Sequence, residues 1–394
     1  MRIVFVSNYI NHHQLPFCKA MLEQHTGEFV FIQTEPMEEE RVQMGWAVNV
    51  KEYPFVRCYY EEEEVCQNLI DESEIVIFGG VEDERYIARR LKEGKILIRY
   101  SERIYKEGQW KFISPKGLVK KFHDHVRYRN KPVYLLCSGA YVASDFSLIH
   151  AYPGKMYSWG YFPEFVEYRL DELAERKKAG GVNKLLWAGR MIDWKHPEYA
   201  VMLAENLHQK GYEFRLTMAG SGVREAELKE RVKSSGIEEY VDFAGYKKPE
   251  EIRELMLDAD IFLFTSDYKE GWGAVLNEAM NSGCAVVAGS GIGAVPYLLQ
   301  HGRNGMVYRN GEPEEMIRLT EELMAEPSRC VTMGLGAYET IRSKWNAENA
   351  AKNLLRFIRS VVAENPEGAA DGPMSKAPII WPSKGYEYTR KGGM

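Results

Sequence analysis

The stretch Lys269-Glu-Gly-Trp-Gly-Ala-Val-Leu-Asn-Glu-Ala-Met-Asn-Ser-Gly-Cys-Ala-Val-Val287 carries the most information about the fold. It follows a short apolar run, Ile261–Phe264, which is typical of a buried strand. Gly271 and Gly273 allow a tight backbone turn before a helix that we expect to begin near Ala274. This order of strand, glycine turn and helix is typical of dinucleotide-binding sheets, where the first N–H groups of the helix favour a diphosphate.

Two glutamates in this stretch are candidates for ligand binding. Glu270 is expected in the loop that faces the ligand, and Glu278 in the second turn of the helix. A carboxylate has two acceptor oxygens, so Glu278 has the chemistry to accept from both hydroxyls of a ribose. From the residues alone two other interpretations stay open: solvated helix charges, or the paired carboxylates of a glycosidase.

Outward from this stretch, short apolar runs alternate with segments of helical period, which predicts an α/β fold with parallel sheets. The first series of expected strands is Ile3–Ser7, Phe29–Gln33, Ile75–Phe78, Ile96–Arg99, Val133–Cys137 and Met156–Trp159. A second series is Leu185–Ala188, Phe214–Ala219, Val241–Phe243, Ile261–Phe264 and Ala285–Ala288. The restart of the pattern near Lys184 predicts a domain boundary.

The 394 residues are too many for one ordinary core, so we expect two domains. The expected division is an N-terminal Rossmann-like domain over 1–165, a linker over 166–182, a C-terminal Rossmann-like domain over 183–345, a closing amphipathic helix over 346–363 and a flexible tail over 364–394. The tail prediction rests on its Gly, Pro and Lys content and its weak apolar periodicity.

A second cluster of candidates lies in Leu185-Leu-Trp-Ala-Gly-Arg-Met-Ile-Asp-Trp-Lys-His-Pro197. Arg190 and Lys195 are five positions apart across a loop, so both side chains can converge on one pair of phosphates. Fixed cations stabilise the negative charge that grows on a departing diphosphate, and for this reason we expect both residues to be catalytic.

The spacing Glu270-x7-Glu278, with Gly-Trp-Gly inside it and Ala-Met-x-x-Gly-x-x-Val-Val after it, resembles the donor-site signature of glycosyltransferase family 4 and related GT-B enzymes. The resemblance covers about Lys184 to Val362, and it includes the Gly-Arg turn with Lys195. It implies a GT-B fold, in which two Rossmann-like domains face each other across a cleft, with the N-terminal domain binding the acceptor and the C-terminal domain binding the sugar nucleotide. It also implies a retaining hexosyl transfer from a UDP-sugar or GDP-sugar without a metal or another cofactor.

The roles that the resemblance implies are assigned residue by residue. Glu270 would hold hydroxyls of the donor sugar, and Glu278 would hold the ribose. The predicted nucleotide-sugar contacts are Gly189, Gly220, Tyr246, Gly271, Trp272, Gly273 and Glu278. Ala294 and Val295 stand where the family commonly has an acidic residue beside the proline, so that contact is absent from this sequence.

The first domain departs more from the family, since Ser7-Asn-Tyr-Ile-Asn-His-His-Gln14 replaces its usual glycine pair. These polar residues follow a strand, where open α/β sheets place ligands, and His13 is predicted to contact acceptor or sugar. His12 and His13 are not expected to bind a metal, because no carboxylate accompanies them. Asp258 and Asp260 resemble a metal-binding D-x-D motif, but they precede a core strand and are interpreted as structural.

Charge is unevenly distributed along the first half. From Arg89 to Lys131 there are fourteen lysines and arginines against four carboxylates, with aromatic residues between them. This pattern favours a surface that meets anionic lipid or a phosphorylated acceptor, such as a lipid-linked glycan of surface polysaccharide assembly. The alternative is a solvated surface, or ion pairs with the acidic run Glu61–Glu64.

Six cysteines without a C-x-x-C pair are expected to be reduced thiols. The apolar start is too short for a signal peptide, so we expect a cytoplasmic protein. The basic segment Arg89–Lys131 further predicts that it is peripheral at the inner membrane face. Nothing in the composition indicates a nucleic-acid partner. Two other functions stay open: a nucleotide-sugar epimerase, which would need an acid and a base around the sugar, and a non-catalytic nucleotide-sugar binding subunit.

Overall fold

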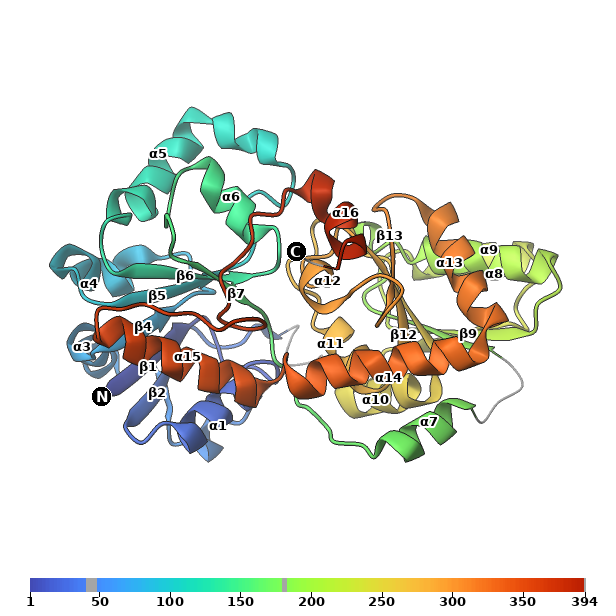
Figure 1. The fold of residues 1–394 in the computed structure, drawn as a ribbon, viewed down its shortest axis with the longest axis horizontal. Coiled ribbons are helices and arrows are strands. Elements are labelled where there is room, and N and C mark those ends of the chain that lie inside the picture. The colour runs from blue at the N-terminus through green and yellow to red at the C-terminus, as the bar shows by residue number, and fades with distance from the viewer. Residues whose placement is uncertain (40–47, 179–182, 393–394) are drawn as a thin grey trace. The chain divides into compact units, whose positions relative to one another are not determined.

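The computed structural model describes residues 1–39, 48–178 and 183–392, and it divides into two compact units. Unit 1 comprises Met1–Glu164 with Lys344–Ile380, and unit 2 comprises Phe165–Ser343 with Trp381–Met394. Each unit contains one parallel sheet with helices packed against it (Figure 1). The prediction of an α/β fold with two Rossmann-like halves is confirmed.

Unit 1 has a seven-stranded sheet in the order β3-β2-β1-β4-β5-β6-β7. Its strands are β1 (Arg2–Ser7), β2 (Glu28–Gln33), β3 (Val56–Cys58), β4 (Ile75–Phe78), β5 (Leu97–Ser101), β6 (Val133–Ser138) and β7 (Met156–Trp159). Its helices are α1 (Leu15–Gln24), α3 (Glu63–Glu72), α4 (Ala88–Glu93), α5 (Pro115–Asp124), α6 (Val142–Leu148) and α15 (Ala347–Val362). The short 3-10 helices are η1 (Val50–Glu52), η2 (Glu84–Ile87), η3 (Gln109–Ile113) and η4 (Val126–Tyr128).

Unit 2 has a six-stranded sheet in the order β10-β9-β8-β11-β12-β13. Its strands are β8 (Asn183–Ala188), β9 (Phe214–Ala219), β10 (Val241–Gly245), β11 (Ile261–Phe264), β12 (Ala285–Gly289) and β13 (Met306–Tyr308). Its longer helices are α7 (Leu170–Lys178), α8 (Glu198–Gln209), α9 (Glu225–Ser234), α10 (Pro249–Asp258), α13 (Pro313–Ala325) and α14 (Pro327–Ser343). Its shorter helices are α11 (Val275–Asn281), α12 (Val295–Leu298), α16 (Gly385–Arg390), η5 (Asp193–Lys195) and η6 (Pro382–Lys384).

The strands form because their apolar runs are covered on both faces. Every residue of β4, β6, β11 and β12 is buried, which is why these segments are continuously hydrophobic instead of alternating. In both sheets the chain order reverses next to the first strand of the unit, between β1 and β4 and between β8 and β11. Ligands of open α/β sheets bind outside the carboxyl ends of the strands at such a switch point.

The segment 364–394, for which the sequence predicts a flexible tail, is ordered over its described residues. Met374 is fully buried, and its N–H donates to the carbonyl oxygen of Ser158 at 2.8 Å. Residues 381–392 belong to unit 2 and end in α16. The apolar residues of this segment are buried singly, so they leave no strand or helix period in the sequence.

The other expected boundaries also differ from the units. The expected linker, 166–182, contains α7, which packs within unit 2 because Leu173 is buried and the Lys177 ammonium donates to the carbonyls of Met256 and Ala259 at 2.7 and 2.5 Å. The expected closing helix, 346–363, is α15, and it belongs to unit 1, where it packs against α1. Residues 179–182 lie outside the described part of the chain.

Candidate active site

The switch point of unit 2 brings together two loops that carry predicted site residues. The loop after β8 leads through Arg190 to Lys195 in η5, and the loop after β11 leads through Ser266 to Glu270. The two strands pair in parallel, with Leu185 beside Ile261 and Trp187 beside Leu263, so both loops leave the same edge of the sheet. This edge is where the sequence predicted donor chemistry.

Lys195 and Glu270 form an ion pair at the centre of this edge. The Lys195 ammonium lies 2.5 Å from Glu270 Oε2, and the two side chains are only 15% and 12% exposed. The Ser266 hydroxyl donates to the same carboxylate oxygen at 3.0 Å. An ammonium has three N–H donors, so Lys195 can keep this pair and still donate to an anionic ligand.

A buried hydroxyl joins the two loops beneath this pair. The Thr265 hydroxyl accepts from the indole N–H of Trp187 at 2.8 Å and donates to the carbonyl oxygen of Lys195 at 2.6 Å. In addition, the N–H of Asp267 donates to the carbonyl oxygen of Trp194 at 2.9 Å. These bonds fix the backbone on both sides of Lys195.

His196 makes a further connection between the loops. Its Nδ1 lies 2.8 Å from Glu198 Oε1, and its Nε2 lies 3.8 Å from Asp267 Oδ2. The carboxylates of Asp267 and Glu198 raise the pKa of His196 to about 9, so the ring is protonated at neutral pH. His196 also has a left-handed backbone with φ of 47°, which turns the chain from η5 into α8.

Arg190 is exposed at the rim of the same edge. Its guanidinium carbon lies 6.0 Å from the centre of the Trp194 ring, and the Lys195 ammonium lies 4.8 Å from the same ring centre. The structure therefore places both predicted cations near one indole, and their convergence on a diphosphate stays a prediction.

Close backbone packing explains several of the glycines. Gly220 has φ of +126°, and a Cβ there would lie 1.9 Å from the carbonyl oxygen of Gly189. A Cβ on Gly293 would lie 1.8 Å from the carbonyl oxygen of Gly271. The first contact brings the ends of β8 and β9 together, and the second brings together the segments that follow β11 and β12, which requires residues without side chains.

The remaining predicted contacts lie around the same edge. Gly273 has φ of +92°, and the Trp272 side chain is fully buried with its N–H donating to Asn277 Oδ1 at 2.9 Å. Only the backbone of Trp272 can therefore meet a ligand. Tyr246 is 48% exposed and follows Gly245, whose carbonyl accepts from the N–H of Gly220 at 2.7 Å.

Glu278 lies in α11 and is half-buried. Burial raises the pKa of its carboxyl to about 7, although the nearby Arg253 lowers it in part. Loss of water around a carboxylate is costly unless a donor replaces it, so this side chain is a suitable acceptor for buried ligand hydroxyls.

Unit 1 gathers polar groups at its own switch point. The Ser7 hydroxyl lies 3.1 Å from the hydroxyl of Tyr100, and the Gln14 amide donates to both, at 3.3 and 3.2 Å. The His13 ring lies 3.8 Å from the His12 ring, and burial together with His12 lowers the pKa of His13 well below its ordinary value. His13 is therefore neutral at physiological pH. The role predicted for it stays a prediction.

Four residues of the donor-side edge were not among the predicted site residues: Thr265, Ser266, His196 and Asp267. Thr265, Ser266 and Asp267 directly follow β11, and this position at the edge of the sheet could have indicated that they belong to the site.

Asp260, interpreted as structural, accepts from the N–H of Lys184 at 2.8 Å. Across residues 1–39, 48–178 and 183–392, no three His, Cys, Asp or Glu side chains gather so as to hold a metal.

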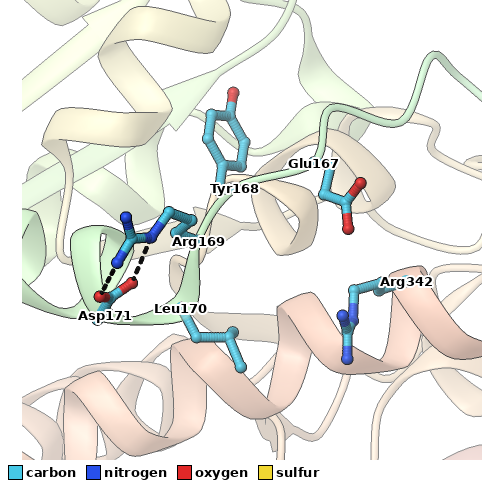
Figure 2. Close-up of a pocket in the computed structure, with 6 residues that line it drawn as sticks. All are labelled: Glu167, Tyr168, Arg169, Leu170, Asp171 and Arg342. Atoms are coloured by element: carbon cyan, nitrogen blue, oxygen red, sulfur yellow. Dashed lines mark hydrogen bonds and ion pairs between the residues drawn. The ribbon is translucent and has the colours of Figure 1, made fainter.

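A hollow of about 630 Å³ lies elsewhere in unit 2. It is lined by Glu167, Tyr168, Arg169, Leu170, Asp171 and Arg342, and the neighbouring Arg169 and Asp171 form an ion pair on one side of it (Figure 2). None of the predicted donor-site residues lines this hollow, so the candidate site rests on the residues at the sheet edge.

Comparison with solved structures defines the class of fold. Anabaena HepE in complex with UDP matches 91% of this chain and 100% of its own, with a TM-score of 0.69 at 14% identity. The lipopolysaccharide outer core galactosyltransferase WaaB matches 92% of this chain and 100% of its own, with a TM-score of 0.68 at 16% identity. The chain therefore has the GT-B fold.

Comparison of sequences is more specific for the second half. Residues 169–340 match the model of the family described as glycosyl transferases group 1. The Erwinia amylovora amylovoran biosynthesis glycosyltransferase AmsK is 28% identical over 180 residues, which are 44% of each chain. A GDP-mannose-dependent phosphatidylinositol monomannoside mannosyltransferase of Mycobacterium tuberculosis is 25% identical over 194 residues, 48% of this chain and 50% of the other. The chain thus spans about half the length of the curated relatives it matches.

Proposed function

We propose that the protein is a glycosyltransferase that moves a sugar from a nucleotide diphosphate sugar to an acceptor in glycan or surface polysaccharide assembly. The observation that carries the proposal is the Lys195–Glu270 pair at the switch point of unit 2, within the region that matches group 1 glycosyl transferases. A half-buried cation beside a carboxylate suits a ligand that has both a diphosphate and sugar hydroxyls.

The donor is a UDP-sugar or a GDP-sugar. Among the similar proteins, HepE was solved with UDP and with UDP-glucose, and the mycobacterial mannosyltransferase is GDP-mannose-dependent. Both nucleotides have the ribose diol that Glu278 is proposed to hold. Tyr246 and the backbone at the end of β10 are proposed to meet the base.

In the proposed mechanism, Arg190 and Lys195 stabilise the charge that develops on the diphosphate as the bond to the anomeric carbon breaks. Glu270 accepts hydroxyls of the donor sugar, and the amides of Gly271, Trp272 and Gly273 meet the sugar and phosphate. Two fixed cations supply this stabilisation without a metal. The sugar keeps its anomeric configuration, as the resemblance to family 4 implies, and no protein nucleophile is assigned.

The acceptor is proposed to be a lipid-linked glycan that unit 1 meets at the anionic inner face of a membrane, with His13 on the acceptor side. All six cysteines are free, as suits a chain that works in a reducing compartment. Among the described helices, none combines the length and apolar character that crossing a bilayer needs.

The test incubates the protein with a panel of UDP- and GDP-sugars and lipid-linked acceptors, and follows free nucleoside diphosphate together with glycosylated lipid. We expect both products in equal amounts, and NMR of the product should show the anomeric configuration of the donor. Formation of an altered nucleotide sugar without transfer would instead indicate an epimerase. Binding without any turnover on a broad panel would favour the non-catalytic subunit.

A further inference from the structure

The basic segment Arg89–Lys131 is not one uniform surface, because most of its cations already have partners in unit 1. Eight of the fourteen bind carboxylates or carbonyl oxygens, and they are Arg89, Arg90, Lys95, Arg99, Arg103, Lys106, Lys111 and Lys131. Arg90, Arg99 and Arg103 are buried outright. The attraction of this segment for an anionic partner therefore has to come from a smaller part of it.

The remaining cations gather around one helix. Five of the six lie between residues 116 and 129, and they are Lys116, Lys120, Lys121, Arg127 and Arg129. The sixth, Lys92, is exposed on α4. Within the described residues, no ion pair joins the five cations to the acidic run Glu61–Glu64, where Glu62 pairs with Arg57 instead. The ion pairs considered as an alternative in the sequence are thus not formed.

This helix, α5, and the preceding 3-10 helix η3 expose large apolar side chains to solvent. The exposed fractions are 68% for Trp110, 65% for Ile113, 59% for Val119 and 51% for Phe122. No residue of α5 is buried. Its flanks are anchored, since Phe112 in η3 and Val126 in η4 pack against the core of unit 1. Together, η3 and α5 therefore present apolar and basic side chains that are both exposed to solvent.

We propose that Trp110, Ile113, Lys116, Val119, Lys120 and Phe122, the α5 surface, dock unit 1 onto a bilayer that contains anionic lipid. Lysines on a helix together with Trp, Ile, Val and Phe suit the boundary between headgroups and acyl chains, where the rings and branched chains enter and the ammonium groups meet phosphate. A site that binds a soluble anion through the lysines alone would not explain why the four apolar side chains are exposed beside them. Docking to the bilayer does not itself depend on the proposed function. Its purpose does rest on that function, because docking would bring unit 1 to a lipid-linked acceptor.

Sedimentation of the full chain with vesicles of phosphatidylcholine alone, or with added phosphatidylglycerol, tests the proposal at low and high salt. We expect binding to the anionic vesicles at low salt and weaker binding at high salt, where charges are screened. Each cation near the surface contributes roughly a fivefold factor, so Lys116→Glu with Lys120→Glu should weaken binding at least 20-fold. Lys92→Glu, in the same basic segment but outside the α5 surface, is the matched control and should bind as the wild type does.

A second pair of variants tests the apolar half of the surface. Trp110→Ser with Phe122→Ser should abolish sedimentation with anionic vesicles, whereas Val223→Ser, which changes a side chain that is 87% exposed in unit 2, should not. The fluorescence of Trp110 should shift to shorter wavelength on vesicles, and the shift should be lost in Trp110→Phe.

Equal binding to neutral and anionic vesicles, no binding at low salt, or equal losses in the control variants would overturn the proposal. So would a dimer, seen by analytical ultracentrifugation, that dissociates in the Trp110→Ser with Phe122→Ser variant, because a second copy would then cover the surface. Calorimetry with UDP- and GDP-sugars separates this outcome from the proposed function, since donor binding by unit 2 is independent of vesicle binding.

Discussion

At the scale of single residues, the carboxyl group of Glu278 links pH to donor binding. Its pKa is raised to about 7 by burial, so near neutral pH only part of the free protein has the ionised form. The ionised carboxylate is the stronger acceptor for the ribose diol. We therefore expect the affinity for a sugar nucleotide to rise up to about tenfold between pH 6 and pH 8 and to level off above that. Calorimetry over this range measures it.

Glu278→Gln is the matched variant, because its amide keeps the size of the side chain but does not ionise. Its affinity should be independent of pH over the same range. Glu278→Ala should weaken binding at all pH values by roughly 1.5–3 kcal/mol, the contribution of a hydrogen bond to a charged group. Unchanged nucleotide affinity in both variants would remove Glu278 from the site.

His196 should link pH to stability in the opposite sense. Its folded pKa of about 9 lies above the ordinary value of 6.5, so its contribution is fully present below pH 6.5 and is lost as pH rises through 9. His196→Asn keeps a residue that tolerates the left-handed backbone but removes the charge. We expect the wild type to lose about 2 kcal/mol of unfolding free energy between pH 7 and pH 9.5, and the variant to lose much less.

Urea unfolding followed by circular dichroism measures this difference. The exposed His208 lies in α8 of the same unit, so His208→Asn is the control and should keep the pH dependence of the wild type. A variant at position 196 with the same pH dependence as the wild type would show that the ring does not connect Asp267 with Glu198 through its charge.

The Lys195 ammonium and the Arg190 guanidinium should together replace a metal. Lys195→Met should lower kcat by about 10²- to 10³-fold, as loss of a preorganised charge at a transition state does. EDTA should leave turnover of the wild type unchanged. Lys229→Met, which removes an exposed lysine in α9, is the control for loss of charge in unit 2. Activity that disappears with EDTA and returns with manganese would contradict this mechanism.

At this scale the sequence predicted the charged residues of the candidate site but not the groups that support them. Lys195 and Glu270 are 75 positions apart, and the structure brings them to 2.5 Å, an ion pair that the sequence did not predict. His196 and Thr265 were missed because their importance comes from bonds between loops, which no local pattern records. The buried state of the Trp272 side chain was equally invisible, since tryptophan is common both in cores and at ligands.

At the scale of elements, the close approach of β8 and β9 depends on Gly220. A Cβ there would lie 1.9 Å from the Gly189 carbonyl oxygen, and φ of +126° is strained for any residue with a side chain. Gly220→Ala should therefore lower the free energy of unfolding by about 3 kcal/mol or more and weaken donor binding. Gly211→Ala is the matched control, because Gly211 also has positive φ but has open space around its Cβ position, and it should cost only about 1 kcal/mol.

Denaturant titration of the two variants measures this difference. Equal losses of unfolding free energy would mean that the positive φ alone sets the cost at both positions. The close approach of β8 and β9 at Gly220 would then add nothing to stability.

The strands themselves were well predicted, since fully buried runs such as Ile75–Phe78 and Ile261–Phe264 have the same bounds in the sequence analysis and in the structure. The edge strands β3 and β13 were missed. Each has only three residues, which is too short for a periodic signal. Within the basic segment, His125 has a φ of −129° and separates α5 from η4.

At the scale of the whole molecule, the C-terminal segment was the least predictable part. Individual residues of this segment contact distant parts of the chain, as Lys376 contacts Tyr157. Because the segment is rich in Gly, Pro and Lys, its sequence has the composition of a solvated tail. The division into two α/β halves needs only the restart of the strand pattern, whereas the path of this segment depends on tertiary contacts.

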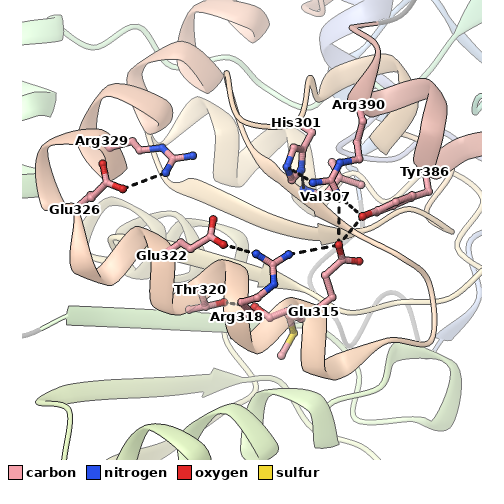
Figure 3. Close-up of polar contacts among 11 residues, drawn as sticks. His301, Val307, Glu315, Arg318, Thr320, Glu322, Glu326, Arg329, Tyr386 and Arg390 are labelled. Carbon is pink, nitrogen blue, oxygen red and sulfur yellow. Dashed lines mark hydrogen bonds and ion pairs between the residues drawn. The ribbon is translucent and has the colours of Figure 1, made fainter. Parts of the chain in front are cut away.

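The last part of this segment should stabilise unit 2 and its donor loop. Tyr386 donates to Glu315 Oε1 at 2.5 Å, and Arg390 lies 3.2 Å from the same oxygen and 3.1 Å from His301 Nε2 (Figure 3). The Tyr268 hydroxyl, two positions before Glu270, donates to the Pro382 carbonyl at 3.1 Å. Truncation after Ile380 removes all of these contacts at once. We therefore expect unit 2 to lose roughly 2–4 kcal/mol of stability and the KM for the sugar nucleotide to rise.

Differential scanning calorimetry with and without sugar nucleotide identifies the transition of unit 2 as the one that the ligand raises. Truncation should lower that transition and leave the other in place, because residues 381–394 belong to unit 2. Tyr386→Phe, which removes only the hydroxyl, should give part of the effect, and Lys384→Ala, which changes an exposed side chain of η6, should give none. If the truncated chain keeps both its transitions and its KM, the contacts of α16 do not support the donor loop, and Glu270 is held by the Lys195 and Ser266 side chains alone.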